Sequence, residues 1–123
     1  MIVDDNELFV AEARALLERE GVEVVGVARS SAEALRAIAE LQPDVTLVDI
    51  DLREESGFDV VSALADAPAA SRSSVILIST HAQADFADLI KASNAAGFVS
   101  KLELSARAIH DVLESVRAGR PRP

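Results

Sequence analysis

Short apolar runs alternate along this chain with longer segments whose apolar residues recur every three or four positions. The short runs are rich in β-branched residues and nearly continuous in hydrophobicity, which is typical of buried parallel strands. They predict five strands, over residues 2–4, 22–28, 44–49, 75–79 and 97–100. The periodic segments that lie between them predict five helices.

Local signals fix where several of these helices begin and end. Ser30 and Glu33 form a capping box for the second helix, and Ser105 caps the last one. Gly21 ends the first helix, and Pro43 ends the segment before the third strand. The third and fourth helices are expected over residues 58–67 and 82–93. The expected core-facing side chains are Phe9, Ala13, Leu16, Leu17, Leu35, Ile38, Ala39, Ala106, Ile109, Val112, Leu113 and Val116.

Strict alternation of strands and helices predicts one domain of α/β class. It implies a doubly wound parallel sheet with helices on both faces and right-handed crossovers. The domain is expected to cover residues 1–118. The Gly- and Pro-containing residues 119–123 are expected to begin a linker or a C-terminal tail.

Composition narrows the function classes. The 123 residues carry a formal charge of −9, so direct nucleic-acid binding by this segment is not expected. Aromatic residues make up 3%, and there is no cysteine, which excludes disulfides and thiolate metal sites. No apolar run approaches the roughly 20 residues of a membrane span, and no signal peptide is evident. A cytoplasmic protein with no membrane association is the expectation.

Polar residues stand where the predicted strands end. Asp4 and Asp5 follow the first strand, Asp49 ends the third, Ser79 ends the fourth, and Lys101 follows the fifth. Carboxyl ends of parallel strands meet at one edge of a sheet, so these groups are expected to lie together. Converging carboxylates repel one another, and Mg²⁺, which prefers oxygen ligands, resolves that conflict. A simpler reading, that Asp4 and Asp5 only interact with the start of the first helix, does not explain Asp49 and Lys101.

The chemistry of this set favours phosphoryl transfer. A carboxylate such as Asp49 can attack phosphorus and form an aspartyl phosphate. Such transfer depends mainly on positioning and on charge neutralisation. The metal acids Asp4 and Asp5, the cation Lys101 and the hydroxyl of Ser79 supply those parts.

At this point the sequence resembles the receiver domain of two-component response regulators. The matching pieces keep the family's order and spacing over nearly the whole chain; they are residues 2–5, 43–50, 57, 75–79 and 97–101. The resemblance implies a flavodoxin-like fold with strand order 2-1-3-4-5. It implies a domain that accepts a phosphoryl group from a sensor histidine kinase and catalyses only its own phosphorylation and dephosphorylation.

The resemblance also implies roles for individual residues. Asp49 resembles the phosphoacceptor, and Asp4 and Asp5 resemble the acid pair that holds Mg²⁺, joined by Asp49 and by the backbone carbonyl of Asp51. Lys101 resembles the lysine that contacts a phosphoryl oxygen. Further residues take their expected roles from position: Ser79 and Phe98 as switch residues, and Gly57 as the turn glycine before the third helix.

The implied switch changes the surface formed by helix 4, strand 5 and helix 5, through which a homodimer or an effector domain would be controlled. Asp51 and His81 each lie two residues beyond a key position, Asp49 and Ser79. They are expected to pair at the mouth of the site and to tune the lifetime of the phosphoryl group. Solvated loop residues are the simpler alternative for both.

This chain departs from the family pattern in places. Leu102, not proline, follows Lys101, and Leu52 and Arg53 stand where a Met-Pro pair is common. A degenerate receiver that acts as an interaction module without phosphorylation is therefore the main alternative. A haloacid-dehalogenase-type phosphatase would place its acid pair on the first strand of a longer chain. A flavodoxin-type binding domain would need a different loop after the first strand.

Overall fold

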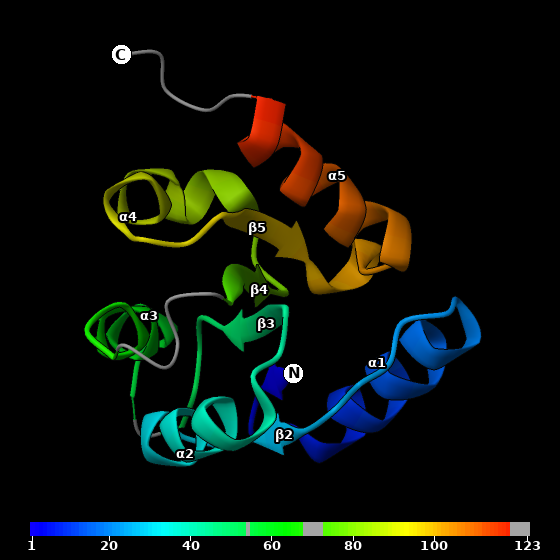
Figure 1. The fold of residues 1–123 in the computed structure, drawn as a ribbon. Helices are drawn as coiled ribbons and strands as arrows, with labels where there is room; N and C mark the ends of the chain where they lie inside the picture. The colour runs from blue at the N-terminus through cyan, green and yellow to red at the C-terminus, as the bar shows by residue number, and fades with distance from the viewer. Residues whose placement is uncertain (54, 68–72, 119–123) are drawn as a thin grey trace.

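The computed structural model describes residues 1–53, 55–67 and 73–118, and the predicted tail at 119–123 lies outside them. Five parallel strands form one sheet in the order β2-β1-β3-β4-β5, which confirms the predicted topology (Figure 1). The strands are β1 (Ile2–Val3), β2 (Val27–Ala28), β3 (Val45–Asp49), β4 (Ser74–Ser79) and β5 (Gly97–Ser100). The site residues expected at the strand ends therefore share one edge.

The helices are α1 (Glu7–Arg19), α2 (Ser31–Leu41), α3 (Gly57–Ala65), α4 (Ala87–Ala92) and α5 (Ala106–Ala118), with 3₁₀ turns η2 (Gln83–Phe86) and η3 (Lys101–Glu103). The capping prediction for α2 is confirmed, since the Ser30 side chain accepts the N–H of Glu33. The single helix expected over 82–93 is wrong at its start. No side chain caps η2 or α4, and Phe86 breaks the helical path with φ −125° and ψ 14°.

The second strand is shorter than predicted. Only Val27 and Ala28 pair in the ladder, opposite Ile2 and Val3 of β1. The apolar run from 22 to 26 therefore stays outside the regular sheet, although Gly26 still accepts the Ile2 N–H at 3.1 Å. A strand needs a partner as well as a suitable sequence.

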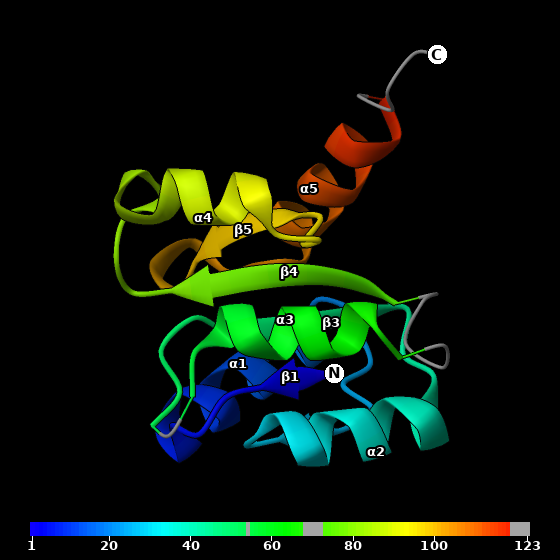
Figure 2. The same cartoon turned by 90° about the vertical axis from the view of Figure 1, so that its left-hand side faces the viewer.

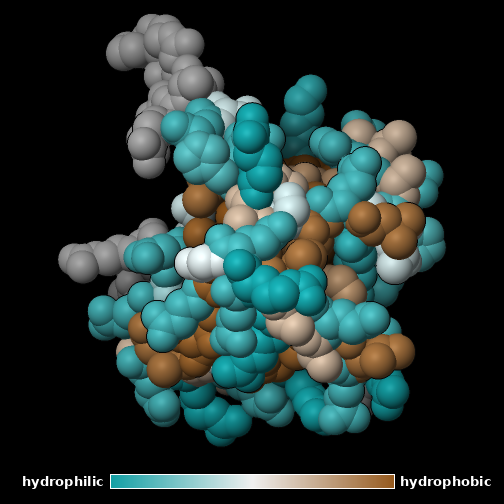
Figure 3. Space-filling model, turned by 90° about the vertical axis from the view of Figure 1, so that its right-hand side faces the viewer, coloured by the Kyte–Doolittle hydropathy of each residue, from teal (hydrophilic) through white to brown (hydrophobic). Residues whose placement is uncertain are grey.

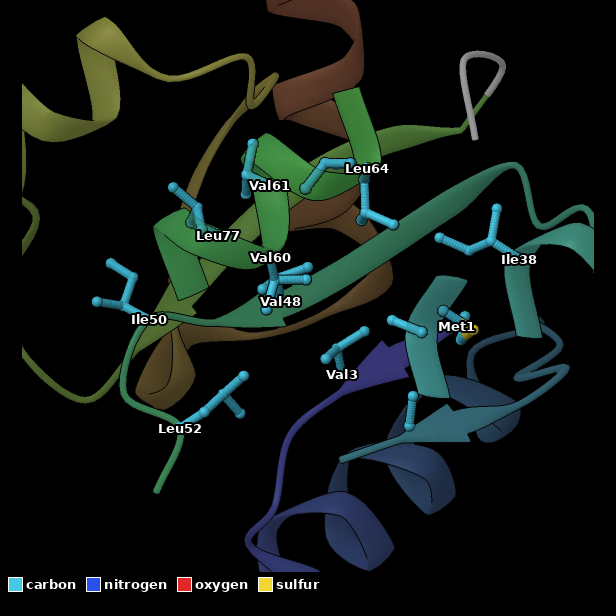
Figure 4. Close-up of a cluster of buried hydrophobic side chains, with 13 residues drawn as sticks. Met1, Val3, Ile38, Val48, Ile50, Leu52, Val60, Val61, Leu64 and Leu77 are labelled. Carbon is cyan, nitrogen blue, oxygen red and sulfur yellow. The ribbon is translucent and has the colours of Figure 1, made fainter. Parts of the chain in front are cut away.

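Helices cover both faces of the sheet (Figure 2). On one side α2 and α3 pack a cluster that includes Val48, Val60, Leu64 and Leu77, and residues of η2 and α4 border it (Figure 4). On the other side α1 and α5 pack against Ile2, Leu47, Ile76 and Ile78. Fully burying a side chain of this size contributes about 1.5–3 kcal/mol each. The two clusters hold the strands in one rigid register beneath the site.

Two of the expected core residues are exposed. Ala39 faces solvent, whereas Ala34 and Ile38, which are four residues apart, form the buried stripe of α2. Val116, near the end of α5, is 37% exposed. None of the helices in the described part of the chain is long and apolar enough to cross a membrane.

Candidate functional site

The carboxyl edge of the sheet brings the predicted residues together. Asp4 follows β1, Asp49 is the last residue of β3, Ser79 is the last of β4, and Lys101 follows β5 directly. The registers between the strands set how far along the sheet each of these residues lies. Val3 is opposite Val48, Asp49 is opposite Ile78, and Ser79 is opposite Ser100. Residues 22 to 97 positions apart in sequence become neighbours through this topology alone.

The three acids form a compact cluster. Asp4, Asp5 and Asp49 each offer one carboxylate oxygen, and these oxygens all lie within 4.8 Å of one another. Asp4 and Asp49 are buried, and Asp5 is half-buried. Like charges at this separation repel by about 3 kcal/mol per pair at an effective dielectric constant of roughly 20. The arrangement requires compensating positive charge.

Lys101 supplies one such charge from within the protein. Its Nζ lies 2.8 Å from Asp4 Oδ2 and 3.3 Å from Asp49 Oδ2, and its side chain is only 8% exposed. With all groups ionised, the three carboxylates and this ammonium carry a net charge of −2, and the exposed Arg53 guanidinium, 3.9 Å from Asp5 Oδ2, offsets it only weakly. Asp4 Oδ2 is buried and has no hydrogen-bond partner among the described residues, and its contact with the Lys101 ammonium, at 2.8 Å, is an ion pair.

The donor set fits Mg²⁺. A hard divalent cation takes carboxylate oxygens together with water, and its charge would balance the two remaining negative charges. Asp4, Asp5 and Asp49 are the residues placed to hold it. The backbone carbonyl of Asp51 stays a predicted ligand.

Asp49 has an unusual titration. Burial raises the pKa of its carboxyl group to about 6, and the neighbouring charge of Asp4 adds to the shift, while Lys101 and the N–H of Asp51 oppose it. That N–H donates to Asp49 Oδ1 at 3.2 Å. The carboxylate is therefore mostly ionised at neutral pH and held by a cation and a backbone donor. It is poorly hydrated, as a nucleophile toward phosphorus needs to be.

Gly57, expected as the turn glycine before the third helix, stands where two backbone segments approach each other closely. It is the first residue of α3, and its N–H donates to the Ile50 carbonyl at 2.7 Å. A Cβ at this position would overlap the Asp49 carbonyl oxygen. Glycine is needed here because the backbones of α3 and β3 approach too closely to leave room for a side chain. A positive φ is not the reason, since Gly57 does not have one.

The start of α1 is arranged by Asn6. Its side chain accepts the Phe9 N–H at 3.1 Å, so Asn6, not Asp4 or Asp5, caps the helix. Asp4 Oδ1 accepts the Asn6 N–H at 2.8 Å. Asp5 Oδ2 accepts the Arg53 N–H at 2.7 Å, a contact that the sequence did not indicate. Asp4 and Asp5 are thus each oriented by a backbone donor to one carboxylate oxygen, and the other oxygen of Asp4 contacts Lys101.

Ser79, His81 and Asp51 form a chain at the mouth of the site. The buried Ser79 hydroxyl accepts the His81 N–H at 3.0 Å and lies 3.3 Å from His81 Nδ1. His81 Nδ1 also lies 3.4 Å from Asp51 Oδ2, and both side chains are more than half exposed. Within the described residues no hydrogen bond joins Ser79 to Asp49 or Lys101. The contacts of the Ser79 hydroxyl in this structure are therefore with His81.

Phe98 lies on β5, beside the end of β4, and lines the same groove as His81. It is half-buried on β5, opposite Leu77, and packs against the cluster covered by α2 and α3. It also lines an open groove with Thr80, Ser100 and residues of α5. The structure places it next to the β4 end but leaves its role as a switch a prediction.

Sequence reasoning missed one neighbour of Lys101. Phe9, expected only as a core residue of α1, has its ring centroid 4.3 Å from Lys101 Nζ. Its position one helical turn beyond Asp5 is the only sequence signal for this contact. That signal becomes informative once β1 and β5 are known to end at the same edge.

Fold and site together define a class: a doubly wound domain whose switch-point edge carries an acid triad, a buried lysine and a hydroxyl. A family model described as "Response regulator receiver domain" matches residues 1–114. The chain therefore belongs to the response regulator receiver domain family.

Relatives agree with this assignment. DivK of Brucella ovis, a polar-differentiation response regulator, is 36% identical over 101 residues, covering 82% of this chain and 81% of its own. A "Putative transcriptional regulator" of Pseudomonas aeruginosa is 33% identical over 103 residues, covering 84% of this chain. The match spans about half, 49%, of that relative's length.

Solved structures show the same fold. The receiver domain of the response regulator NarL from Mycobacterium tuberculosis superposes with a TM-score of 0.77 at 30% identity, covering 94% of this chain and 93% of its own. The receiver domain of a diguanylate cyclase from Desulfovibrio desulfuricans G20 gives 0.75 at 30% identity, covering 96% and 91%.

Proposed function

We propose that Asp49 accepts a phosphoryl group from a sensor histidine kinase in a Mg²⁺-dependent reaction. The observation that carries the proposal is the buried Asp4–Lys101–Asp49 arrangement, in which one ammonium lies within 3.3 Å of both carboxylates. A purely structural ion pair would not need a third carboxylate within 4.8 Å of the other two. A site for a divalent cation and a phosphoryl group does.

In the proposed step a carboxylate oxygen of Asp49 attacks phosphorus. The P–N bond of the phosphohistidine breaks as the P–O bond to Asp49 forms, and the nitrogen leaves with the electron pair. Bound Mg²⁺ would neutralise charge on the transferred group. Lys101 remains beside Asp49 and offers its ammonium to a phosphoryl oxygen.

Ser79 would carry the signal onward. Its hydroxyl is held by the His81 N–H, so turning toward the phosphoryl group breaks this bond and frees the residues around it. Phe98 and the surface of α4, β5 and α5 would then shift and alter contact with an effector domain or a second copy. A cytoplasmic location stays a prediction.

Asp51 and His81 are proposed to set the lifetime of the phosphoryl group. Their side chains lie 3.4 Å apart at the mouth of the site, where an attacking water would enter. His81→Ala is expected to change the dephosphorylation rate without changing uptake. Equal decay in both proteins, followed by loss of the phosphoryl mass, would assign the pair to ordinary loop contacts.

Intact mass after incubation with acetyl phosphate and Mg²⁺ tests the main proposal. Wild type should gain one phosphoryl group, whereas Asp49→Asn and wild type with chelator should gain none. No gain in folded wild type would favour the interaction-module alternative. Gain in both proteins would move the acceptor away from Asp49.

A further inference from the structure

Phe9 contributes a contact to Lys101 that the phosphoryl chemistry described above leaves unused. The ammonium lies 4.3 Å from the centroid of the Phe9 ring, inside the roughly 6 Å range of a cation–π interaction. The Lys101 side chain is 8% exposed, so little water competes with the ring. Desolvation makes such a contact stronger than it is on a surface.

The other two partners of Lys101 have a second function in this site. Asp4 and Asp49 lie 2.8 and 3.3 Å from Nζ, and both belong to the cluster proposed to hold Mg²⁺. A carboxylate that binds a divalent cation attracts a nearby ammonium less strongly, because its charge is shared. The Phe9 ring takes no part in metal binding and keeps its attraction for Nζ.

The backbone beyond Lys101 gives the side chain little support. Lys101 begins the short 3₁₀ turn η3, and the next residue, Leu102, is 84% exposed. The turn is secured by the Leu102 N–H, which donates to Ser100 Oγ at 3.2 Å. Contacts to the side chain itself must therefore define where the ammonium lies.

The ring, in contrast, is held in place. Phe9 lies in the first turn of α1, and its N–H donates to the capping side chain of Asn6 at 3.1 Å. Its side chain packs against the cluster between α1, α5 and the sheet. The N-cap follows directly on Asp4 and Asp5, so the same turn fixes the acids and the ring.

We propose that Phe9 is a positioning residue for Lys101: its ring holds the ammonium beside Asp49 while the carboxylates bind Mg²⁺. This inference rests on the proposed phosphoryl acceptance by Asp49. It assigns to an aromatic side chain of α1 the task of keeping the cation in place for the incoming phosphoryl oxygen.

A graded series tests the interaction apart from the packing. Replacing Phe9 by its 4-fluoro, 3,5-difluoro and 3,4,5-trifluoro analogues nearly preserves shape but progressively weakens the negative face of the ring. The rate of phosphorylation by acetyl phosphate at saturating Mg²⁺ should fall in that order. Phe9→Leu should lose about tenfold, and Phe9→Tyr, which keeps the aromatic face, should stay within about twofold of wild type. The same analogues at Phe58, whose ring faces Phe86 at 6.3 Å, provide the matched control and should give a flat series.

A spectroscopic readout needs no phosphoryl donor. The ε-methylene protons of Lys101 should show an upfield ring-current shift that survives in Phe9→Tyr and disappears in Phe9→Leu. A flat fluorine series in a wild type that does take up phosphate, or an unchanged shift in Phe9→Leu, would overturn the role of Phe9 and leave the phosphoacceptor proposal standing. Failure of wild type to take up a phosphoryl group would overturn both.

Discussion

The two ends of this parallel sheet differ in how they accommodate buried charged groups. At the carboxyl end, Asp4, Asp49 and Lys101 are nearly enclosed, and each charge has an opposite charge within 3.3 Å. At the amino end the lining is mostly apolar, around a pocket of about 540 Å³. Side chains of α1, α5 and the starts of β1 and β3 surround it. In Figure 3, which views the α1 and α5 side, brown apolar surface lies among teal polar side chains.

One charge is nevertheless buried at the amino end. The Met1 ammonium donates to the Val45 carbonyl at 2.9 Å, in line with the ladder between β1 and β3. Burial lowers the pKa of this amine from 8.0 to about 6, although the charge of Asp44 opposes the shift. The carboxyl end thus offsets part of its negative charge with Lys101, whereas the amino end holds a single charge whose ionised form burial disfavours.

The largest expected effect is at the contact that brings α3 against the carboxyl end. Gly57→Ala should lower the free energy of unfolding by about 3 kcal/mol, because the new Cβ would overlap the Asp49 carbonyl oxygen. Denaturant unfolding measures this. Ser62→Ala, on the exposed side of the same helix, is the control and should change stability by less than about 0.5 kcal/mol. Equal stability of both variants would show that α3 can move away from Asp49 without cost.

Removing the internal cation should come next. Lys101→Met keeps most of the side-chain volume but leaves Asp4 and Asp49 buried without their cation, at a cost of about 2–3 kcal/mol in metal-free buffer at pH 7. Mg²⁺ should restore part of this loss, since it binds the same carboxylates. Lys91→Met on the exposed surface of α4 should be neutral and insensitive to Mg²⁺. A Lys101→Met protein as stable as wild type without metal would refute mutual charge balance at this end.

The comparison also shows what a sequence can reveal. Asp4, Asp49, Ser79 and Lys101 could be placed together because strand alternation dictates a parallel sheet, and parallel strands end at one edge. That inference needs no knowledge of side-chain packing. The class of site followed from the residue types gathered at that edge, whereas the strand order was implied only by the resemblance to receiver domains.

Other features depend on contacts that no local pattern encodes. The length of β2 was overestimated because pairing depends on the two residues of β1, not on the β-branched run itself. The Phe9–Lys101 contact joins α1 to the end of β5 and depends on how the helix packs. The reason for Gly57 is a backbone approach of α3 to β3, which looks in sequence like an ordinary turn glycine.

The titration of Asp49 should give the carboxyl end of the sheet its own pH dependence of the free energy of unfolding. Its raised pKa of about 6, against 3.8 unfolded, means that the folded state binds more protons between these values. The free energy of unfolding of metal-free protein should therefore fall as pH rises from about 4 to 6 and then level off. Asn at position 49 removes this slope, so Asp49→Asn should exceed wild type by about 1–2 kcal/mol at pH 7 in chelator. Saturating Mg²⁺ should reverse the order; the same order with and without Mg²⁺ would argue against a metal on Asp49.

The smallest expected effect on stability comes from the Met1 amine at the amino end of the sheet. Its pH dependence has the opposite sign to that of Asp49. The Met1 amine, with its pKa lowered to about 6, binds fewer protons when folded than when unfolded between pH 6 and 8. Its contribution to the free energy of unfolding should rise across that window, by on the order of 1 kcal/mol. Acetylation of the amine removes the charge but keeps an N–H for the Val45 carbonyl, so the difference between acetylated and free protein isolates this one group from His81 and His110. The difference should be largest below about pH 6 and vanish above pH 8, and a difference independent of pH would mean that the ammonium is hydrated after all. Mg²⁺ should leave it unchanged, because the acid triad lies at the other end of the strands.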